Sequence, residues 1–460
     1  MNSTETVSVG AALSGAALAG AMPAQATPAE AAPAGSARAE VAAAAAAGPL
    51  ALIGARLISG TGAAPVPDTD VLVAQGRILR IGPTGSIGIP ADARRIPCAG
   101  LTVLPGFIDS HTHVEQEIPA ALAAFLRDGV TSIGNTGCGP QLIEVLHLAG
   151  RDPAAAHAFV AGPAITAPGG YPAIRGDGSA ARGVASEAEA AAAVDELVGR
   201  GSDFIKMTQE SFDFDYRTPG HLPVLAPALI AAVARRAREH GLPVRSHVHH
   251  VDQLDVALAA GVSSVEHLLF PLPPDTGYVE LHRSGRLGLD ALPEFDRRID
   301  RMVAAGIRLV PTLGGELVNI RLSLPELPEA AVRGIEELLV TVLAKYVAAG
   351  GRVALGSDWV GLPGIPAGLP REELGHLLAA GLTPLQVIEA GTQGAAAVCG
   401  QAGQRGVLAP GLAADLILVE GDPSTDLGAL DALRLVVKDG RAVTVDHFAR
   451  GAAEPAPLSS

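Results

Sequence analysis

The sequence contains few cysteines, few aromatic residues and no long, strongly apolar run. Its three cysteines, Cys98, Cys138 and Cys399, are widely spaced and form no CxxC pair, so no disulfide framework is indicated. Aromatic residues make up 3% of the chain and none precedes Phe107, so the core must consist mainly of Ala, Val, Leu and Ile. Residues 7–22 are apolar, but Ala and Gly are too weakly hydrophobic for a membrane span of about 18 residues.

Charge is also scarce, and its balance is acidic. Charged residues account for 18% of the 460 positions, and the formal net charge is −15. Because such a chain repels phosphate backbones and anionic lipid headgroups, we expect neither a nucleic acid nor a membrane as partner. The expected partner is a small-molecule substrate, and the composition is compatible with a homo-oligomer.

The first 48 residues are rich in Ala and Pro, and we expect them to form a disordered leader. Residues 7–26 are similar to the apolar region and cleavage site of a signal peptide. A secretory signal should begin with positive charge, whereas this segment carries Glu5 and has no basic residue before Arg38. We therefore expect a cytoplasmic protein, with secretion as the alternative if the leader acts as a signal peptide. A flexible tail is expected over 447–460.

Between residues 101 and 402, short apolar segments alternate with Ala- and Leu-rich stretches of helical pattern. This alternation predicts an α/β fold, a (β/α)₈ barrel in which the C-terminal strand ends converge on one mouth. Short β segments with Gly and Asp turns occupy 49–100 and 403–446, and we expect the two flanks to form one composite β-sandwich domain. The barrel strands are predicted at 103–113, 130–135, 157–165, 203–208, 243–249, 263–269, 308–313 and 353–358.

Two histidines end the first expected barrel strand. His111 and His113 lie two residues apart, so both side chains project from one face of the strand, into the barrel. Two imidazoles placed in this way are suitable ligands for Zn²⁺ or a similar ion. Asp109 shares the face, where orienting a ligand or capping a turn is the favoured role.

Lys206 lies in the apolar segment DFIKM, where a buried ammonium would be costly and could not bind a metal. Burial lowers the pKa of a lysine and makes the free amine nucleophilic. Its reaction with CO₂ would give a carbamate, a carboxylate on a long arm that could bridge two cations. The alternative is a lysine paired with an acid such as Asp203.

Three later strand ends carry further candidates. His247 and His249 share a face at the end of the fifth expected strand, and His267 closes the sixth. Asp358 ends the eighth strand in the segment GSDW, where a carboxylate can bind an ion and accept a proton from water. Because the strand ends converge, we expect these residues to meet His111 and His113.

These motifs together resemble the amidohydrolase superfamily, most closely its prolidase/imidazolonepropionase-like branch, over about residues 50–445. The resemblance rests on PGFIDSHTH, GVTSI, GPAITAPGG, DFIKM, SHVHH, GVSSVEH, LGSDW and GVLAPGLAADLILVEGDP. It implies two divalent ions per chain, usually Zn²⁺, in a (β/α)₈ barrel with a composite β-sandwich domain. His111, His113 and Asp358 would hold the buried ion, His247 and His267 the exposed ion, and a carbamate on Lys206 would bridge them.

Lys206 also favours the prolidase-like side of this branch, because the true imidazolonepropionases lack the bridging lysine. One loop departs from the pattern: prolidase-like members often carry a histidine after the paired glycines, where this chain has Tyr171 in GGYPAIRG. Tyr171 and Arg175 are the candidate substrate-binding residues. Arg175 could bind a substrate carboxylate, or it could be a solvated loop residue.

We therefore expect an enzyme that uses a metal-bridging hydroxide to cleave a C–N bond in an amide or cyclic amide. X-Pro dipeptides and N-acyl amino acids are candidate substrates. Asp358 would pass the proton to the leaving amine, and His249 would hydrogen-bond the developing oxyanion. The alternatives are a mononuclear deaminase or cyclic-amidine hydrolase with a structural Lys206, and a scaffold protein without activity.

Overall fold

The computed structural model describes residues 48–211, 221–267, 292–362 and 365–443. The expected tail, and all of the expected leader except Gly48, lie outside these residues. The protein is a mixed α/β structure, as the strand and helix pattern predicts, and its described strands form three sheets. No helix in the described ranges combines the length and the apolar character that crossing a bilayer requires.

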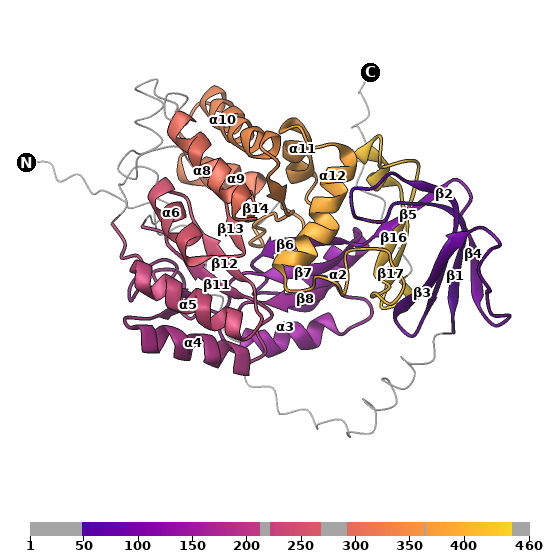
Figure 1. Ribbon diagram of the computed structural model, residues 1–460, viewed down its shortest axis with the longest axis horizontal. Helices are drawn as coiled ribbons and strands as arrows, with labels where there is room; N and C mark the ends of the chain where they lie inside the picture. The colour runs from indigo at the N-terminus through magenta and orange to yellow at the C-terminus, as the bar shows by residue number, and fades with distance from the viewer. Residues whose placement is uncertain (1–47, 212–220, 268–291, 363–364, 444–460) are drawn as a thin grey trace, which may run out of the picture.

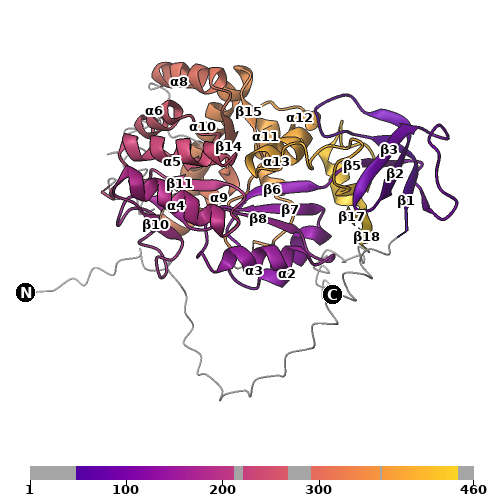
Figure 2. The same ribbon diagram turned by 60° about the horizontal axis from the view of Figure 1, so that its bottom comes forward.

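One sheet combines strands from both ends of the described chain. Its order is β18-β17-β16-β5-β1-β2-β3, with β4 beside β1. The central pairing is antiparallel between β16 and β5, with Leu418 opposite Val103. Figures 1 and 2 show this sheet at one end of the molecule. Its strands are β1 (Leu50–Leu57), β2 (Val66–Ala74), β3 (Arg77–Pro83), β4 (Arg94–Pro97), β5 (Leu101–Pro105), β16 (Leu416–Glu420), β17 (Leu433–Lys438) and β18 (Arg441–Val443).

Two tight turns in this sheet follow directly from the sequence. Gln75-Gly76 connects β2 to β3, and Asp439-Gly440 connects β17 to β18. All four residues have positive φ, between 47° and 75°. This backbone matches the twist of a two-residue hairpin, which explains the glycine at the second position of each turn.

The remaining strands are parallel and belong to two sheets that backbone hydrogen bonds connect. Asp203 N donates to Val160 O at 3.0 Å on one side, and Asp358 N donates to His111 O at 2.8 Å on the other. The first sheet contains β6 (Phe107–Thr112), β7 (Val130–Asn135) and β8 (His157–Val160). The second contains β9 (Ala164–Thr166), β10 (Ala181–Gly183), β11 (Ile205–Thr208), β12 (Val244–His247), β13 (Ser264–Glu266), β14 (Arg308–Val310) and β15 (Arg352–Val353).

Helices cover the outer side of the parallel strands (Figure 1). The helix over 187–199 illustrates how the sequence forms them: the Ser186 hydroxyl accepts from Glu189 N at the N-terminus, and small alanines face the core. The longer helices are α2 (Ile118–Arg127), α3 (Leu142–Gly150), α4 (Glu187–Gly199), α5 (Pro227–Glu239), α6 (Val251–Ala260), α8 (Leu292–Ala304), α9 (Leu313–Ser323), α10 (Glu329–Ala348) and α11 (Arg371–Ala379). Shorter ones are α12 (Pro384–Glu389) and α13 (Ala395–Val398).

Candidate metal centre

A cavity of about 750 Å³ lies at the C-terminal ends of the parallel strands. The residues that line it come from segments far apart in the sequence, because parallel strands bring their C-terminal ends to one side. Of the residues predicted for the site, His249 is not in the cavity wall, whereas eight others are: His111, His113, Tyr171, Arg175, Lys206, His247, His267 and Asp358.

His111, in β6, and His113, one residue beyond it, meet the carboxylate of Asp358. The Oδ1 atom of Asp358 lies 3.5 Å from His111 Nε2 and 3.2 Å from His113 Nε2. The backbone bond from Asp358 N to His111 O fixes this approach. One possible ligand atom from each of the three residues lies within 4.8 Å of the other two, which is close enough for a single ion.

Two further histidines lie beside this group. The His247 and His267 rings, from the ends of β12 and β13, have centroids 4.3 Å apart, and His267 is 4.9 Å from the His111 ring. Thus the four histidines form one continuous cluster. Three residues that follow strands in or beside this cluster have positive φ: His267, Thr312 and Asp358. This left-handed backbone turns the chain sharply away from the strand.

Lys206 reaches the same cavity from β11. Its side chain is buried, and within the described part of the chain its Nζ atom has no hydrogen-bond partner. Burial lowers the pKa of Lys206 to about 8. Asp203, the alternative partner considered from the sequence, is bound instead by His147 Nε2 at 2.9 Å and Val160 N at 2.8 Å. Asp203 is therefore not the ion-pair partner of Lys206, and the nearby carboxylates that raise the lysine pKa are Glu266 and Asp358.

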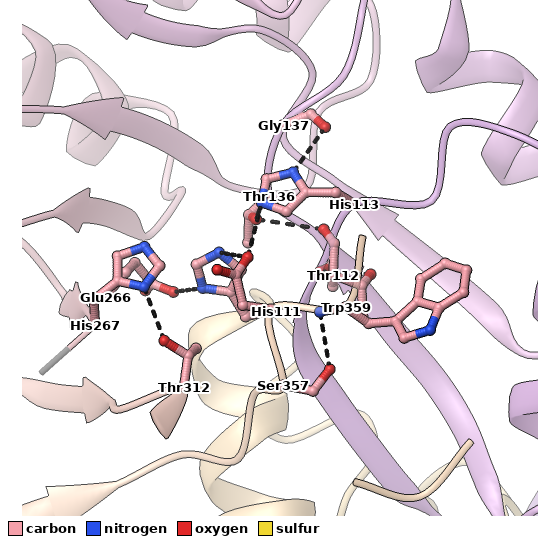
Figure 3. Close-up of polar contacts among 12 residues, drawn as sticks. His111, Thr112, His113, Thr136, Gly137, Glu266, His267, Thr312, Ser357 and Trp359 are labelled. Carbon is pink, nitrogen blue, oxygen red and sulfur yellow. Dashed lines mark hydrogen bonds and ion pairs between the residues drawn. The ribbon is translucent and has the colours of Figure 1, made fainter. Parts of the chain in front are cut away.

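Each of the four histidines has one ring nitrogen next to an acceptor outside the histidine cluster, and Figure 3 shows this for His111, His113 and His267. Histidines that bind metals commonly donate their other N–H in this way, which fixes the ring and its tautomer. The remaining nitrogens are Nε2 of His111, His113 and His267 and Nδ1 of His247. The four contacts are His111 Nδ1 to Glu266 Oε2 at 2.7 Å, His113 Nδ1 to Gly137 O at 3.3 Å, His267 Nδ1 to Thr312 Oγ1 at 2.8 Å, and His247 Nε2 to Glu210 Oε2 at 3.2 Å.

The charge states at neutral pH suit a divalent cation. Burial lowers the pKa of His111 to about 4 and that of His247 to about 3, so both imidazoles are neutral. Burial raises the pKa of Asp358, but the nearby His111 and His113 outweigh it and bring the value to about 2. Neutral imidazoles and an ionised carboxylate are the donor forms that metal binding requires.

Asp109 has the supporting role that the sequence favours, because its carboxylate orients neighbouring residues. Its carboxylate accepts from His111 N at 3.2 Å and from Ser357 N at 3.0 Å, and it also bonds the Ser357 hydroxyl. It thereby joins the β6 end to the segment that carries Asp358. Burial raises the pKa of Asp109 to about 7.

The His249 side chain is buried and lies outside the cavity wall. Its Nδ1 is 2.6 Å from Glu210 Oε2 and its Nε2 is 3.6 Å from Glu316 Oε2. Burial lowers the pKa of His249, but the hydrogen bond to Glu210 and the nearby Glu316 carboxylate raise it to a net value of about 10. Because His249 does not line the cavity, its contact with an oxyanion stays a prediction.

Tyr171 and Arg175 form part of the cavity wall on the loop between β9 and β10. The Tyr171 ring lies 5.3 Å from the His247 ring, and the Arg175 guanidinium stacks 5.6 Å from the centroid of the tyrosine. Burial raises the pKa of Tyr171 to about 12, so its hydroxyl stays protonated at neutral pH.

Sequence reasoning missed the acids that contact the histidines. Glu266, the last residue of β13, and Glu210, two residues beyond β11, are both fully buried. An acid at the end of an apolar strand is the same signal that singled out Lys206, and it could have identified both. Their partners, in contrast, depend on the side-chain directions of neighbouring strands.

The comparisons with known proteins agree with this geometry. The family model described as the Amidohydrolase family matches residues 102–447. The chain belongs to the amidohydrolase family. The superfamily assignment made from the motifs is thereby confirmed.

Two curated relatives and one solved structure illustrate the range of this amidohydrolase's neighbours. The adenine deaminase of Chelativorans sp. (strain BNC1) is 27% identical over 388 residues, which is 81% of this chain and 54% of the relative. The N-acyl-D-aspartate deacylase of Alcaligenes xylosoxydans xylosoxydans is 37% identical over 95 residues, 20% of this chain and 18% of the relative. The chain thus spans about half of the first relative and a fifth or less of the second.

The solved structure is a prolidase complexed with N-methylphosphonate-L-proline. It has 21% sequence identity and a TM-score of 0.68, and the match covers 86% of this chain and 100% of the other. At this identity the likeness concerns the fold alone.

Two adjacent glycines at the start of α9 provide a test of the geometry around Asp358. A Cβ at Gly315 would lie 2.8 Å from Asp358 Cβ, whereas one at Gly314 would find no atom nearer than 3.7 Å. Gly315→Ala should therefore displace Asp358, lower the bound divalent metal per chain and cost about 1–3 kcal/mol of stability. Gly314→Ala is the control and should keep the wild-type metal content and stability. Equal metal content in the two variants, measured by elemental analysis, would contradict this account of the site.

Proposed function

We propose that this amidohydrolase is a metal-dependent hydrolase that cleaves a C–N bond in an amide or cyclic amide of a small substrate. The observation that carries the proposal is the cluster of four histidines, each with its outer nitrogen next to an acceptor, around one cavity with Asp358 and Lys206. Family membership supports it, and the deaminase and deacylase relatives are both named for reactions at C–N bonds.

The architecture proposed for the chain is a closed (β/α)₈ barrel over about 101–402, next to a composite β-sandwich domain from 49–100 and 403–446. Parallel pairing within the two sheets and the backbone bonds between them support the closed barrel. The sheet built from both flanks supports the composite domain. Because β5 pairs with β16, the boundary between the two units falls after Pro105.

Within this barrel, His111, His113 and Asp358 would hold one Zn²⁺ or other divalent ion, and His247 and His267 a second. A carbamate on Lys206 would bridge the two. The residues fit this assignment: the imidazoles of His111 and His247 are neutral, the Asp358 carboxylate is ionised, and the Lys206 amine has no hydrogen bond within the described part of the chain. Because its pKa is about 8, part of this amine is unprotonated near neutral pH. The free amine can add to CO₂ and release a proton, which would give a carbamate whose negative charge bound cations would neutralise.

Two divalent ions held by these residues would supply Lewis acidity, which lowers the pKa of water and polarises a carbonyl. Asp358, ionised and at the cavity surface, accepts a proton from the attacking water and passes it to the leaving amine. Tyr171 keeps its phenolic proton and can donate to a carbonyl oxygen, and Arg175 offers a cation to a substrate carboxylate. These contacts favour acylated amino acids, including X-Pro dipeptides and N-acyl amino acids.

A second candidate is a mononuclear deaminase on the same scaffold, favoured by the match of 81% of this chain to an adenine deaminase. A purified sample separates the two. Hydrolysis of dipeptides, N-acyl amino acids or cyclic amides, with about two ions per chain and loss of activity with chelator, is the expected result. Adenine deamination with one ion per chain would establish the alternative, and active protein without any ion would refute both.

Variants of Lys206 test the bridge. Lys206→Ala should disrupt the metal centre, and short carboxylic acids should partly restore it by entering the cavity left by the side chain. Lys206→Arg should not restore it, because a guanidinium stays protonated and neither reacts with CO₂ nor binds a metal. Native intact-mass analysis should find one CO₂ added to the wild type and none in the variants. A fully active Lys206→Arg variant with both ions would show that the lysine has no bridging role.

A further inference from the structure

Two buried glutamates contact the proposed ligands without belonging to them. Glu266 Oε2 lies 2.7 Å from His111 Nδ1, and Glu210 Oε2 lies 3.2 Å from His247 Nε2. Both side chains are fully buried, and neither is part of the cavity wall. His111 and His247 belong to different proposed ion sites, so each site has one histidine next to a carboxylate.

The carboxylate of Glu266 is fixed by Arg245. Arg245 Nη2 donates to Oε2 at 2.6 Å and Nε donates to Oε1 at 3.0 Å, while the Ser264 hydroxyl donates to Oε1 at 2.8 Å. This buried carboxylate thus accepts three hydrogen bonds, two of them from a guanidinium, and such partners require its ionised form. An ionised carboxylate only accepts hydrogen bonds, so His111 must carry its proton on Nδ1. Its Nε2 lone pair is then the one that remains for a metal.

His249 has the corresponding place next to Glu210. Its Nδ1 is 2.6 Å from Glu210 Oε2, and its other nitrogen faces Glu316. The same Glu210 oxygen lies 3.2 Å from His247 Nε2, and a carboxylate oxygen accepts from both rings. His247 must therefore donate from Nε2, which directs the lone pair of Nδ1 to the cavity side.

We propose that Glu266 and Glu210 are positioning residues that fix the tautomer and orientation of His111 and His247, and that Arg245 and His249 hold these two carboxylates in place. The inference rests on the proposed metal centre. Neutral histidine has two tautomers, and the wrong one would present an N–H to the ion. A carboxylate held by a buried cation accepts a hydrogen bond from one ring nitrogen only, so it selects one tautomer for one histidine of each site.

The test is the Zn²⁺ affinity of each site in the full chain, measured by competition with a chromophoric chelator. Glu266→Gln should weaken one binding step about 10–100-fold, and Glu210→Gln should weaken the other by a similar factor. The step that His113→Ala removes identifies the first site, and the step that His267→Ala removes identifies the second. This selectivity separates positioning from a general loss of structure, which would affect both steps.

Asp70→Asn is the matched control. Asp70 is a buried carboxylate in the composite sheet that accepts from Gly54 N and Gly85 N, both at 2.9 Å. The Asp70→Asn variant should keep both Zn²⁺ affinities at wild-type values. If a glutamine variant does not fold, Glu266→Asp and Glu210→Asp take its place, because they keep the charge and withdraw the oxygens from the histidines.

Wild-type affinities at both sites in folded glutamate variants would overturn the proposal. So would the complete loss of one ion in His249→Asn, since this would make Glu210, His247 and His249 direct ligands of a single ion; one atom from each lies within 4.8 Å of the others. A wild-type chain that binds no ion would instead refute the proposed function itself. The two failures are therefore distinguishable.

Discussion

The burial of ionisable groups away from water is the constraint on which this site depends. Charges cannot stay in such a place unless each has a partner, and most of the described groups have one. Glu266 has Arg245, and Glu210 has His249. The exception is the Lys206 amine, for which the described residues supply no hydrogen bond. A carbamate on its nitrogen, together with cations bound beside it, would balance the buried charge.

The fold meets this constraint by bringing strand ends together. Parallel strands place His111, Lys206 and His247 on one side, and left-handed backbone at His267 and Asp358 turns the chain there. Glycine is required where the cavity residues approach other segments most closely: a Cβ at Gly356 would lie 2.7 Å from the Cβ of His111. Replacement of a cavity histidine or of such a glycine therefore changes the arrangement of the same side chains.

The sequence predicts which residues come together at the cavity because their signal is local. Alternation along a strand places His111 and His113 on one face, and a lysine in an apolar strand is conspicuous by itself. The two flanking β regions likewise indicate the composite sheet. No local pattern shows that His249 turns to Glu210 and Glu316, or that Asp203 binds His147, because these contacts depend on how neighbouring strands and helices are aligned. The composite sheet also extends to Pro105, since pairing with β16 decides where β5 ends.

Anomalous diffraction at the zinc edge, from crystals of Zn²⁺-loaded protein, tests the central claim most directly. The account predicts two peaks about 3.5–4 Å apart, one beside His111, His113 and Asp358 and one beside His247 and His267. Continuous density from Lys206 Nζ should reach both. A single peak with an unmodified lysine, or an ion between Glu210 and His249, would contradict the account.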